Sequence, residues 1–278
     1  MVKLGDYNTM TITRFVESGA YLDAGEGLEI LMPKRYTTAE MHPGDEVKVF
    51  VYLDQANKPV ATLETPLAKV GEFACLRVSW LNEYGAFLDW GLLKDLFVPF
   101  SEQRTKMLQG EDYIVYIYVD EVTGRIAGTS RISTHITDDS SSLSPRQEVE
   151  VLVYKRTSLG YKAIILGPNC EGTIYHNELF RTLSYGDKLK AYVKNIRPDG
   201  KVDLVLQEGG RQHVEDFSVT LLNSLQQKAN HFIALNDKSD PEDIYDYFGV
   251  SKKTFKRAVG ALYKERLIEI SDDGIKLL

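Results

Sequence analysis

The chain has 278 residues, of which 43% are hydrophobic and 26% charged, with a formal net charge of −7 at pH 7. This length predicts two to four soluble domains, and no stretch approaches the roughly 20 apolar residues of a membrane helix. Residues 1–6 lack the apolar core of a signal peptide, and Cys75 and Cys170 form no CxxC pair. We therefore expect a cytoplasmic protein without a membrane partner or a structural metal.

Two sequence landmarks recur along the chain. The motif GAYLD at residues 19–23 returns as GAFLD at 85–89 and more loosely as GYKA at 160–163. A second landmark, Gly-Asp or Gly-Glu, begins at residues 44, 110 and 186, so the two glycines are 25, 25 and 26 residues apart. Chance similarity between turns rarely keeps both landmarks three times, and this spacing predicts three related repeats.

Each repeat is expected to form about five β-strands. In the second repeat we expect strands at 73–81, 86–89, 96–100, 113–120 and 126–131, which are rich in Val, Ile and Tyr. Matching fourth strands are expected at 47–53 and 189–196. Short strands with glycines at the bends predict a mainly β fold of small closed OB-type barrels. Simple β-sandwich modules are the structural alternative.

The remainder of the chain has a helical period. A polar linker, TDDSSSLS, is expected at 137–144, and a glycine junction at 209–211 ends the barrels. Helices are expected at about 217–231, 241–248 and 252–266, with Pro241 in a first turn, Gly249 as a stop and Ser251 as a cap. A hairpin at 268–277 completes a winged helix. The resulting domains are 1–65, 66–138, 145–208 and 213–278.

Charge is distributed unevenly among these domains. Residues 1–138 hold 13 basic and 20 acidic residues, whereas 145–208 hold 10 and 8. Six of the nine basic residues in 213–278 fall within 251–266. Local charge governs attraction to phosphate, and we therefore expect the C-terminal half to bind nucleic acid more tightly than the N-terminal half.

The segments YGAFLDWG, LFVPFSE and GEDYIVYIYVDEVTGRIAGTS of the second repeat resemble the S1 RNA-binding domain, an OB-fold module. The first and third repeats match it more loosely. The resemblance implies an RNA-binding face, on which the first aromatic position of the family falls on Tyr84. Its second aromatic position falls on Tyr21, Phe87 and Lys162 in the three repeats.

The histidine position of the family falls on Pro33, Pro99 and Tyr175, and His176 follows the last of these. The third repeat thus replaces aromatic residues by charge, and a basic groove with a tyrosine suits single strands. An ordinary solvated lysine face is the alternative. The candidate RNA-binding residues of the three repeats are Tyr21, Trp80, Tyr84, Phe87, Arg125, Lys155, Arg156, Lys162, Tyr175, His176, Arg197 and Lys201.

The helix expected at 252–266 is amphipathic. Its apolar residues gather on one side at 100° per residue, and the opposite side carries Lys253, Lys256, Arg257 and Lys264. Such a face could enter a major groove or follow a phosphate backbone, and an exposed lysine face is the alternative. Because no Asn or Gln lies there to read base edges, backbone contact is favoured.

Three S1-like repeats followed by a winged helix resemble the bacterial conserved virulence factor B family. The resemblance implies a cytoplasmic single-stranded RNA-binding protein that influences gene expression after transcription. The five histidines are scattered and no phosphate loop or nucleophile motif is present, so we expect no catalysis, cofactor or small-molecule substrate. The alternative function is a regulator that binds duplex DNA through residues 253–264, with the barrels as interaction or spacer modules.

Overall fold

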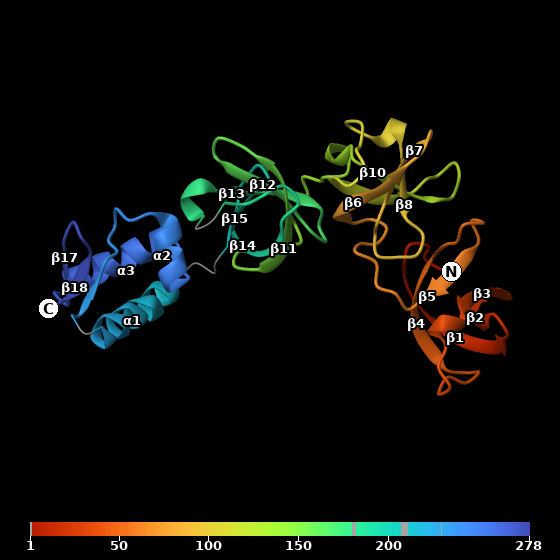
Figure 1. Cartoon of the computed structure of the whole chain (residues 1–278), viewed down its shortest axis with the longest axis horizontal. Coiled ribbons are helices and arrows are strands. Elements are labelled where there is room, and N and C mark those ends of the chain that lie inside the picture. The colour runs from red at the N-terminus through yellow and green to blue at the C-terminus, as the bar shows by residue number, and fades with distance from the viewer. Residues whose placement is uncertain (1, 180–181, 207–210, 229) are drawn as a thin grey trace. The chain divides into compact units, whose positions relative to one another are not determined.

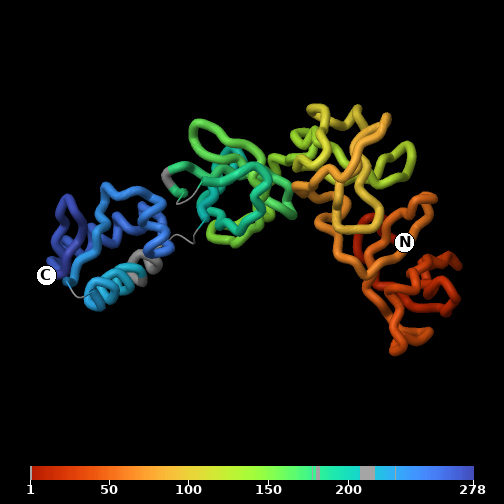
Figure 2. The backbone as a smooth tube through the Cα atoms, viewed as in Figure 1, coloured from red at the N-terminus to blue at the C-terminus, as the bar shows by residue number. Residues whose placement is uncertain are grey.

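The computed structural model describes residues 2–179, 182–206, 211–228 and 230–278. The chain divides into two compact units, an N-terminal unit, Met1–His135, and a C-terminal unit, Ile136–Leu278. Each domain is made from one continuous stretch of chain, as the colour sequence of Figures 1 and 2 shows. Three five-stranded barrels, closed or nearly closed, precede a small winged-helix region, and the predicted fold class is confirmed.

The first barrel is closed and has the strand order β1-β2-β3-β5-β4. The third barrel is also closed and repeats this order as β11-β12-β13-β15-β14. Closure excludes the sandwich alternative for these two domains. The strands of the first barrel are β1 (Asp6–Val16), β2 (Gly19–Gly25), β3 (Leu28–Pro33), β4 (Glu46–Leu53) and β5 (Pro59–Thr62). Those of the third are β11 (Glu148–Arg156), β12 (Gly160–Ile165), β13 (Cys170–Tyr175), β14 (Lys188–Ile196) and β15 (Val202–Val205).

The second barrel is a five-stranded sheet with the order β10-β9-β6-β7-β8. Its two edge strands approach closely, since a Cβ added to Gly128 of β10 would lie 2.9 Å from the Leu96 side chain of β8. The observed strands agree with the expected ones within one or two residues. They are β6 (Phe73–Leu81), β7 (Gly85–Leu88), β8 (Leu96–Pro99), β9 (Asp112–Val119) and β10 (Ile126–Thr129). One 3₁₀ turn follows the third strand of each barrel, at η1 (Lys34–Tyr36), η2 (Phe100–Glu102) and η4 (His176–Glu178), and η3 (Ile132–Thr134) follows β10.

The repeated glycine of the GAYLD motif is required by a close approach between strands. In every barrel it opens the second strand and pairs with the last residue of the third strand. A Cβ at this glycine would lie 2.0, 2.3 and 2.1 Å from a backbone carbonyl oxygen in the first, second and third barrels. No side chain fits at such a distance. The three pairs are Gly19 with Pro33, Gly85 with Pro99 and Gly160 with Tyr175.

The two barrels of the N-terminal unit share one hydrophobic core. Phe50 of the first barrel and Trp90 of the second are both buried and meet edge to face, with ring centroids 6.0 Å apart. Lys69 Nζ donates to Asp6 Oδ1 at 3.0 Å across the same contact. Burial of large aromatic surfaces at this junction makes the two barrels one packed body.

The segment 137–144 is not the free linker that its composition predicts. Leu143 is buried in the core of the third barrel, Ser140 is also buried, and Thr137 forms a β-bridge with Cys170. One leucine in a polar stretch is sufficient to dock it, because burying that side chain is favourable by about 1.5–3 kcal/mol. Residues 209 and 210 of the expected glycine junction lie outside the described residues.

In its described residues the C-terminal domain contains three helices and the sheet β16-β18-β17. Asp240 and Ser251 cap α2 and α3 through their side chains, and Gly249 ends α2 with φ 68°. The apolar face of α3 is buried as predicted. Within the described residues, no helix is long and apolar enough to span a bilayer. The elements are α1 (Arg211–Gln227), β16 (Phe232–Ile233), α2 (Pro241–Phe248), α3 (Lys252–Lys264), β17 (Ile268–Ile270) and β18 (Ile275–Leu277).

Candidate nucleic-acid interface

Every barrel carries an equivalent cross-strand pair, which we call the platform pair. The first strand of each barrel has a β-bulge, after Ile12, Val78 or Val153. A bulge changes the direction of the side chains that follow it. The next paired residues on the first and second strands form the platform pairs. These pairs are Arg14 with Tyr21, Trp80 with Phe87 and Lys155 with Lys162.

The platform pair of the second barrel is an aromatic stack. The rings of Trp80 and Phe87 are 3.7 Å apart and inclined by only 3°, and Phe97 lies tilted at 5.0 Å from Phe87. Asp95 Oδ2 accepts a hydrogen bond from Trp80 Nε1 at 2.9 Å. Trp80 is 44% exposed. Both rings belong to predicted RNA-binding residues, and Phe87 contacts Phe97 on the inner side of the stack, whereas Trp80 is the outer ring.

The platform pair of the first barrel joins a cation to a ring. The Arg14 guanidinium lies 4.2 Å from the centre of the Tyr21 ring and forms an ion pair with Glu29 at 2.7 Å. Hydrogen bonds from Arg14 and Thr13 lower the pKa of Glu29. The predicted residue Tyr21 is therefore covered on one side by an arginine, an arrangement typical of cation–π contacts.

A carboxylate at the same position supports each platform pair. Glu29, Asp95 and Glu171 bind Arg14, Trp80 and Lys162 respectively. The residue inside the bulge also donates to this carboxylate, as Thr13, Ser79 and Tyr154 do. Sequence reasoning missed these acids because none of them falls on a position of the S1 domain's RNA-binding face. The sequence nevertheless contained a signal for them. Glu29, Asp95 and Glu171 are separated by 66 and 76 residues, which matches the spacing of the repeats.

The platform of the second barrel borders a cavity of about 660 Å³. Three predicted residues line it, namely Tyr84, Phe87 and Arg125, together with Phe97 and Tyr118. Tyr84, at the edge of this cavity, is 66% exposed. Exposed and half-buried rings beside a cation are what stacking of unpaired bases requires. The structure thus brings together four of the predicted residues, Trp80 included, on one side of the second barrel.

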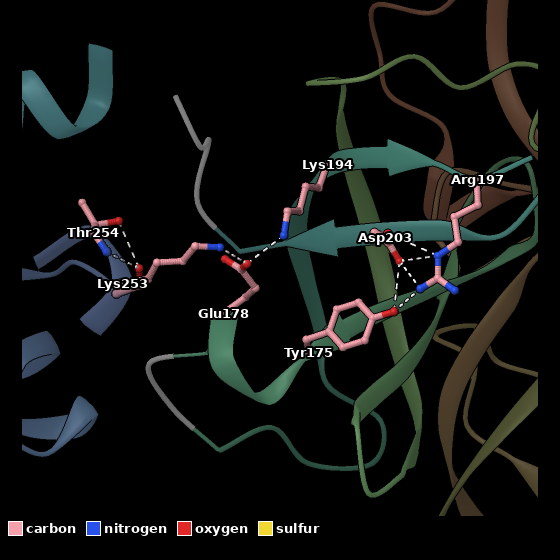
Figure 3. A network of polar contacts seen from close by, with 8 residues as sticks. Tyr175, Glu178, Lys194, Arg197, Asp203, Lys253 and Thr254 are labelled. Atoms are coloured by element: carbon pink, nitrogen blue, oxygen red, sulfur yellow. Dashed lines mark hydrogen bonds and ion pairs between the residues drawn. The ribbon is translucent and has the colours of Figure 1, made fainter. Parts of the chain in front are cut away.

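Several predicted cations of the third barrel are paired with carboxylates. Arg197 Nη2 donates to Asp203 Oδ1 at 2.6 Å and also contacts the Tyr175 hydroxyl, as Figure 3 shows. The remaining pairs are Lys162 with Glu171 at 2.6 Å and Lys201 with Asp199 at 3.1 Å. Compensated charges attract phosphate less, so these three cations are less available to phosphate than the exposed cations of the predicted groove.

Two predicted cations of the third barrel remain exposed at the end of β11. Lys155 and Arg156 have no ion pair within the part of the chain that the structure describes. His176 is exposed next to them, with Nε2 3.2 Å from the Thr157 carbonyl oxygen. Of the basic residues expected on this barrel, Lys155 and Arg156 are therefore the best placed to meet phosphate.

The basic face of α3 is partly occupied by the third barrel. Lys253 and Lys194 both donate to Glu178 (Figure 3). The Glu178 side chain is only 10% exposed. Burial alone would raise the pKa of Glu178, but the hydrogen bonds from the two lysines outweigh it and lower that pKa. Lys256 lies 3.9 Å from Asp237, whereas Arg257 and Lys264 are exposed without an ion pair among the described residues.

No group of three or more His, Cys, Asp or Glu side chains is arranged to hold a metal ion within the described ranges.

Family comparisons agree with this architecture. Residues 4–64 match the S1 domain family, and residues 219–277 match the CvfB-like winged helix domain. An S1 domain, further OB-like barrels and a winged helix in one chain define a nucleic-acid-binding protein. The predicted resemblance to the conserved virulence factor B family is confirmed by these matches and by relatives that align with over 90% of the chain.

The relatives are similar along almost their whole length. The chain is 28% identical to YitL of Bacillus subtilis over 271 residues, which is 94% of this chain and 89% of that protein. It is 22% identical to conserved virulence factor B of Staphylococcus aureus over 260 residues, or 91% and 86%. A Streptococcus pneumoniae structure, described as a multidomain protein with nucleic acid binding domains, has 25% identity and a TM-score of 0.43, covering 99% of this chain and 98% of its own.

Proposed function

We propose that this protein binds single-stranded RNA without catalysis and regulates gene expression after transcription. The observation that carries the proposal is the platform pair, which lies at the same place on three barrels and contains only aromatic and cationic side chains. Aromatic rings stack on unpaired bases, and cations neutralise phosphates. A surface that repeats these two chemistries suits a flexible single strand.

The two units divide this task. The N-terminal unit supplies stacking through Trp80 and the rings around its cavity. The C-terminal unit supplies charge through the exposed residues Lys155, Arg156, Arg257 and Lys264. Phosphate contacts provide most of the sequence-independent affinity, and stacking adds to it with little preference among bases. The expected ligand is therefore single-stranded RNA of broad sequence.

Duplex DNA readout by α3 receives less support. Lys253, which lies on the face that would enter a groove, donates to Glu178 of the third barrel. The exposed side of this helix has no amide side chain that could read a base edge. Contact between Arg257 or Lys264 and a phosphate backbone agrees better with this arrangement.

The salt dependence of binding tests the charge assignment. For single strands, the slope of log K against log salt is about −0.7 for each neutralised phosphate. Replacing Lys155 and Arg156 together by alanine should therefore make the slope shallower by about 1.4. Fluorescence anisotropy with a labelled single-stranded RNA measures it.

The matched control replaces Lys188 and Lys190 of the same barrel, which pair with Glu150 and Glu148. The control changes the net charge equally and should leave the slope almost unchanged. Equal slopes for wild type and the Lys155/Arg156 variant, or no RNA binding at all, would contradict the proposal.

A further inference from the structure

We propose that the cavity of the N-terminal unit holds one unpaired nucleotide, so that the first barrel completes the RNA site of the second. This inference rests on the proposed function and names a part of the same site. It gives the first barrel a second contribution to RNA binding, beside its own platform pair of Arg14 and Tyr21.

The cavity has one wall from each barrel. The first barrel contributes Leu53 at the end of β4 with Gln55 and Asn57 of the following turn, and the second barrel contributes the rings of Phe97 and Tyr118. Its volume of about 660 Å³ lies within the range of roughly 300–1,000 Å³ that is usual for small-ligand sites. A lining that combines flat rings with amide side chains suits an aromatic base, which offers both a face for stacking and an edge for hydrogen bonds.

Lys94 points to an anionic component of the ligand. Its Nζ donates to the Asp54 carbonyl oxygen at 2.7 Å and lies 3.4 Å from Asn57 Oδ1. Burial lowers the pKa of this lysine. Both partners are neutral, and no carboxylate among the described residues lies within ion-pair distance. The Asp54 carboxylate attracts this ammonium only from beyond ion-pair distance, so the half-buried charge lacks a direct partner and favours a phosphate nearby.

Two carboxylates, Asp95 and Asp120, also line the cavity and keep their charge. Their oxygens are already engaged, because Asp95 accepts hydrogen bonds from Trp80 and Ser79, and Asp120 accepts two from Thr123. Arg125 adds an exposed cation at the edge. A base combined with a phosphate, which is a nucleotide, matches this set of groups.

The two walls are held in place by packing within the unit. The buried ring of Trp90 meets Phe50 of the first barrel, and the Trp90 carbonyl accepts a hydrogen bond from the Leu67 backbone at 2.8 Å. Lys94 itself ties the β4–β5 turn to the second barrel. A cavity with preformed walls loses less entropy when a nucleotide enters it.

The test compares full-length variants in binding a fluorescein-labelled single-stranded RNA. Lys94→Met removes the ammonium and should weaken binding about tenfold, the scale of one charge-assisted hydrogen bond. Lys106→Met is the matched control, because Lys106 is an exposed lysine of the same barrel outside the cavity. Asn57→Gly lies at an exposed turn position of the first barrel whose φ of 60° glycine adopts without strain. This variant should also weaken binding, and it settles the question if Lys94→Met lowers the melting temperature.

Photo-crosslinking gives an independent readout. RNA that contains 4-thiouridine should crosslink to the first-barrel turn at residues 53–58 as well as to the second barrel. If Trp80→Ala weakens binding while the Lys94 and Asn57 variants bind normally and the turn stays unlabelled, the cavity inference is wrong and the proposed function stands. If the Trp80→Ala variant also binds RNA normally, the cavity inference and the proposed function both fail for this surface of the second barrel.

Discussion

Replacing Trp80 by alanine removes the outer ring of the aromatic stack. The indole is 44% exposed and lies parallel to Phe87 at 3.7 Å, so one of its faces is open to a base. A base stacked on an aromatic ring contributes about 1–3 kcal/mol by alanine substitution. The expected increase in Kd is therefore about five- to 150-fold.

The fold should tolerate this change, because a half-exposed ring contributes less to the core than a buried side chain. Leu88→Ala is the contrasting variant. Leu88 is 0% exposed, and its truncation should destabilise the barrel by about 2–5 kcal/mol. Thermal unfolding should separate the two variants, with a much larger decrease in melting temperature for Leu88→Ala.

Intrinsic fluorescence provides the assay beside anisotropy. The chain has two tryptophans, and Trp90 is only 3% exposed. RNA should quench the emission of Trp80, and this quenching should disappear in Trp80→Ala while the emission of Trp90 remains. A folded Trp80→Ala protein with wild-type RNA affinity would refute the stacking argument.

Three more results are expected. The C-terminal unit, residues 136–278, should bind RNA more tightly than residues 1–135 at low salt, and equal affinities would count against the charge argument. Raising the salt concentration from 50 to 200 mM should weaken binding by the full chain steeply, which a titration of labelled RNA measures. Because the folded-state pKa of Glu178 is lowered, its ion pairs should stabilise the C-terminal unit above the unfolded pKa and lose this effect as pH falls through the folded pKa. Glu178→Gln should accordingly lower the melting temperature at pH 7 and have little effect in acid, and a pH-independent loss would contradict this assignment.

The barrels could be predicted because their signals are local in sequence. The glycine at residues 19, 85 and 160 reflects a steric contact with the third strand, and any larger side chain would clash there. The cap at Ser251 and the stop at Gly249 are equally local. Composition alone predicted a linker at residues 137–144, and this prediction was wrong because one residue, Leu143, is enough to dock the polar segment on the third barrel.

The site was harder to predict because it depends on partners from other strands. Arg197, Lys162 and Lys253 are basic in the sequence, but each meets a carboxylate that only the fold brings close. The parallel rings of Trp80 and Phe87 likewise depend on the bulge in β6. Aromatic positions could be identified from the repeats, whereas their stacking order and the charge compensation could not.

Competition between two nucleic acids tests the central claim most directly. The full chain is bound to a labelled single-stranded RNA and titrated with unlabelled RNA of the same sequence or with duplex DNA of equal length. We predict that the RNA displaces the label at concentrations at which the duplex does not. Displacement by duplex DNA at equal or lower concentration would contradict the account.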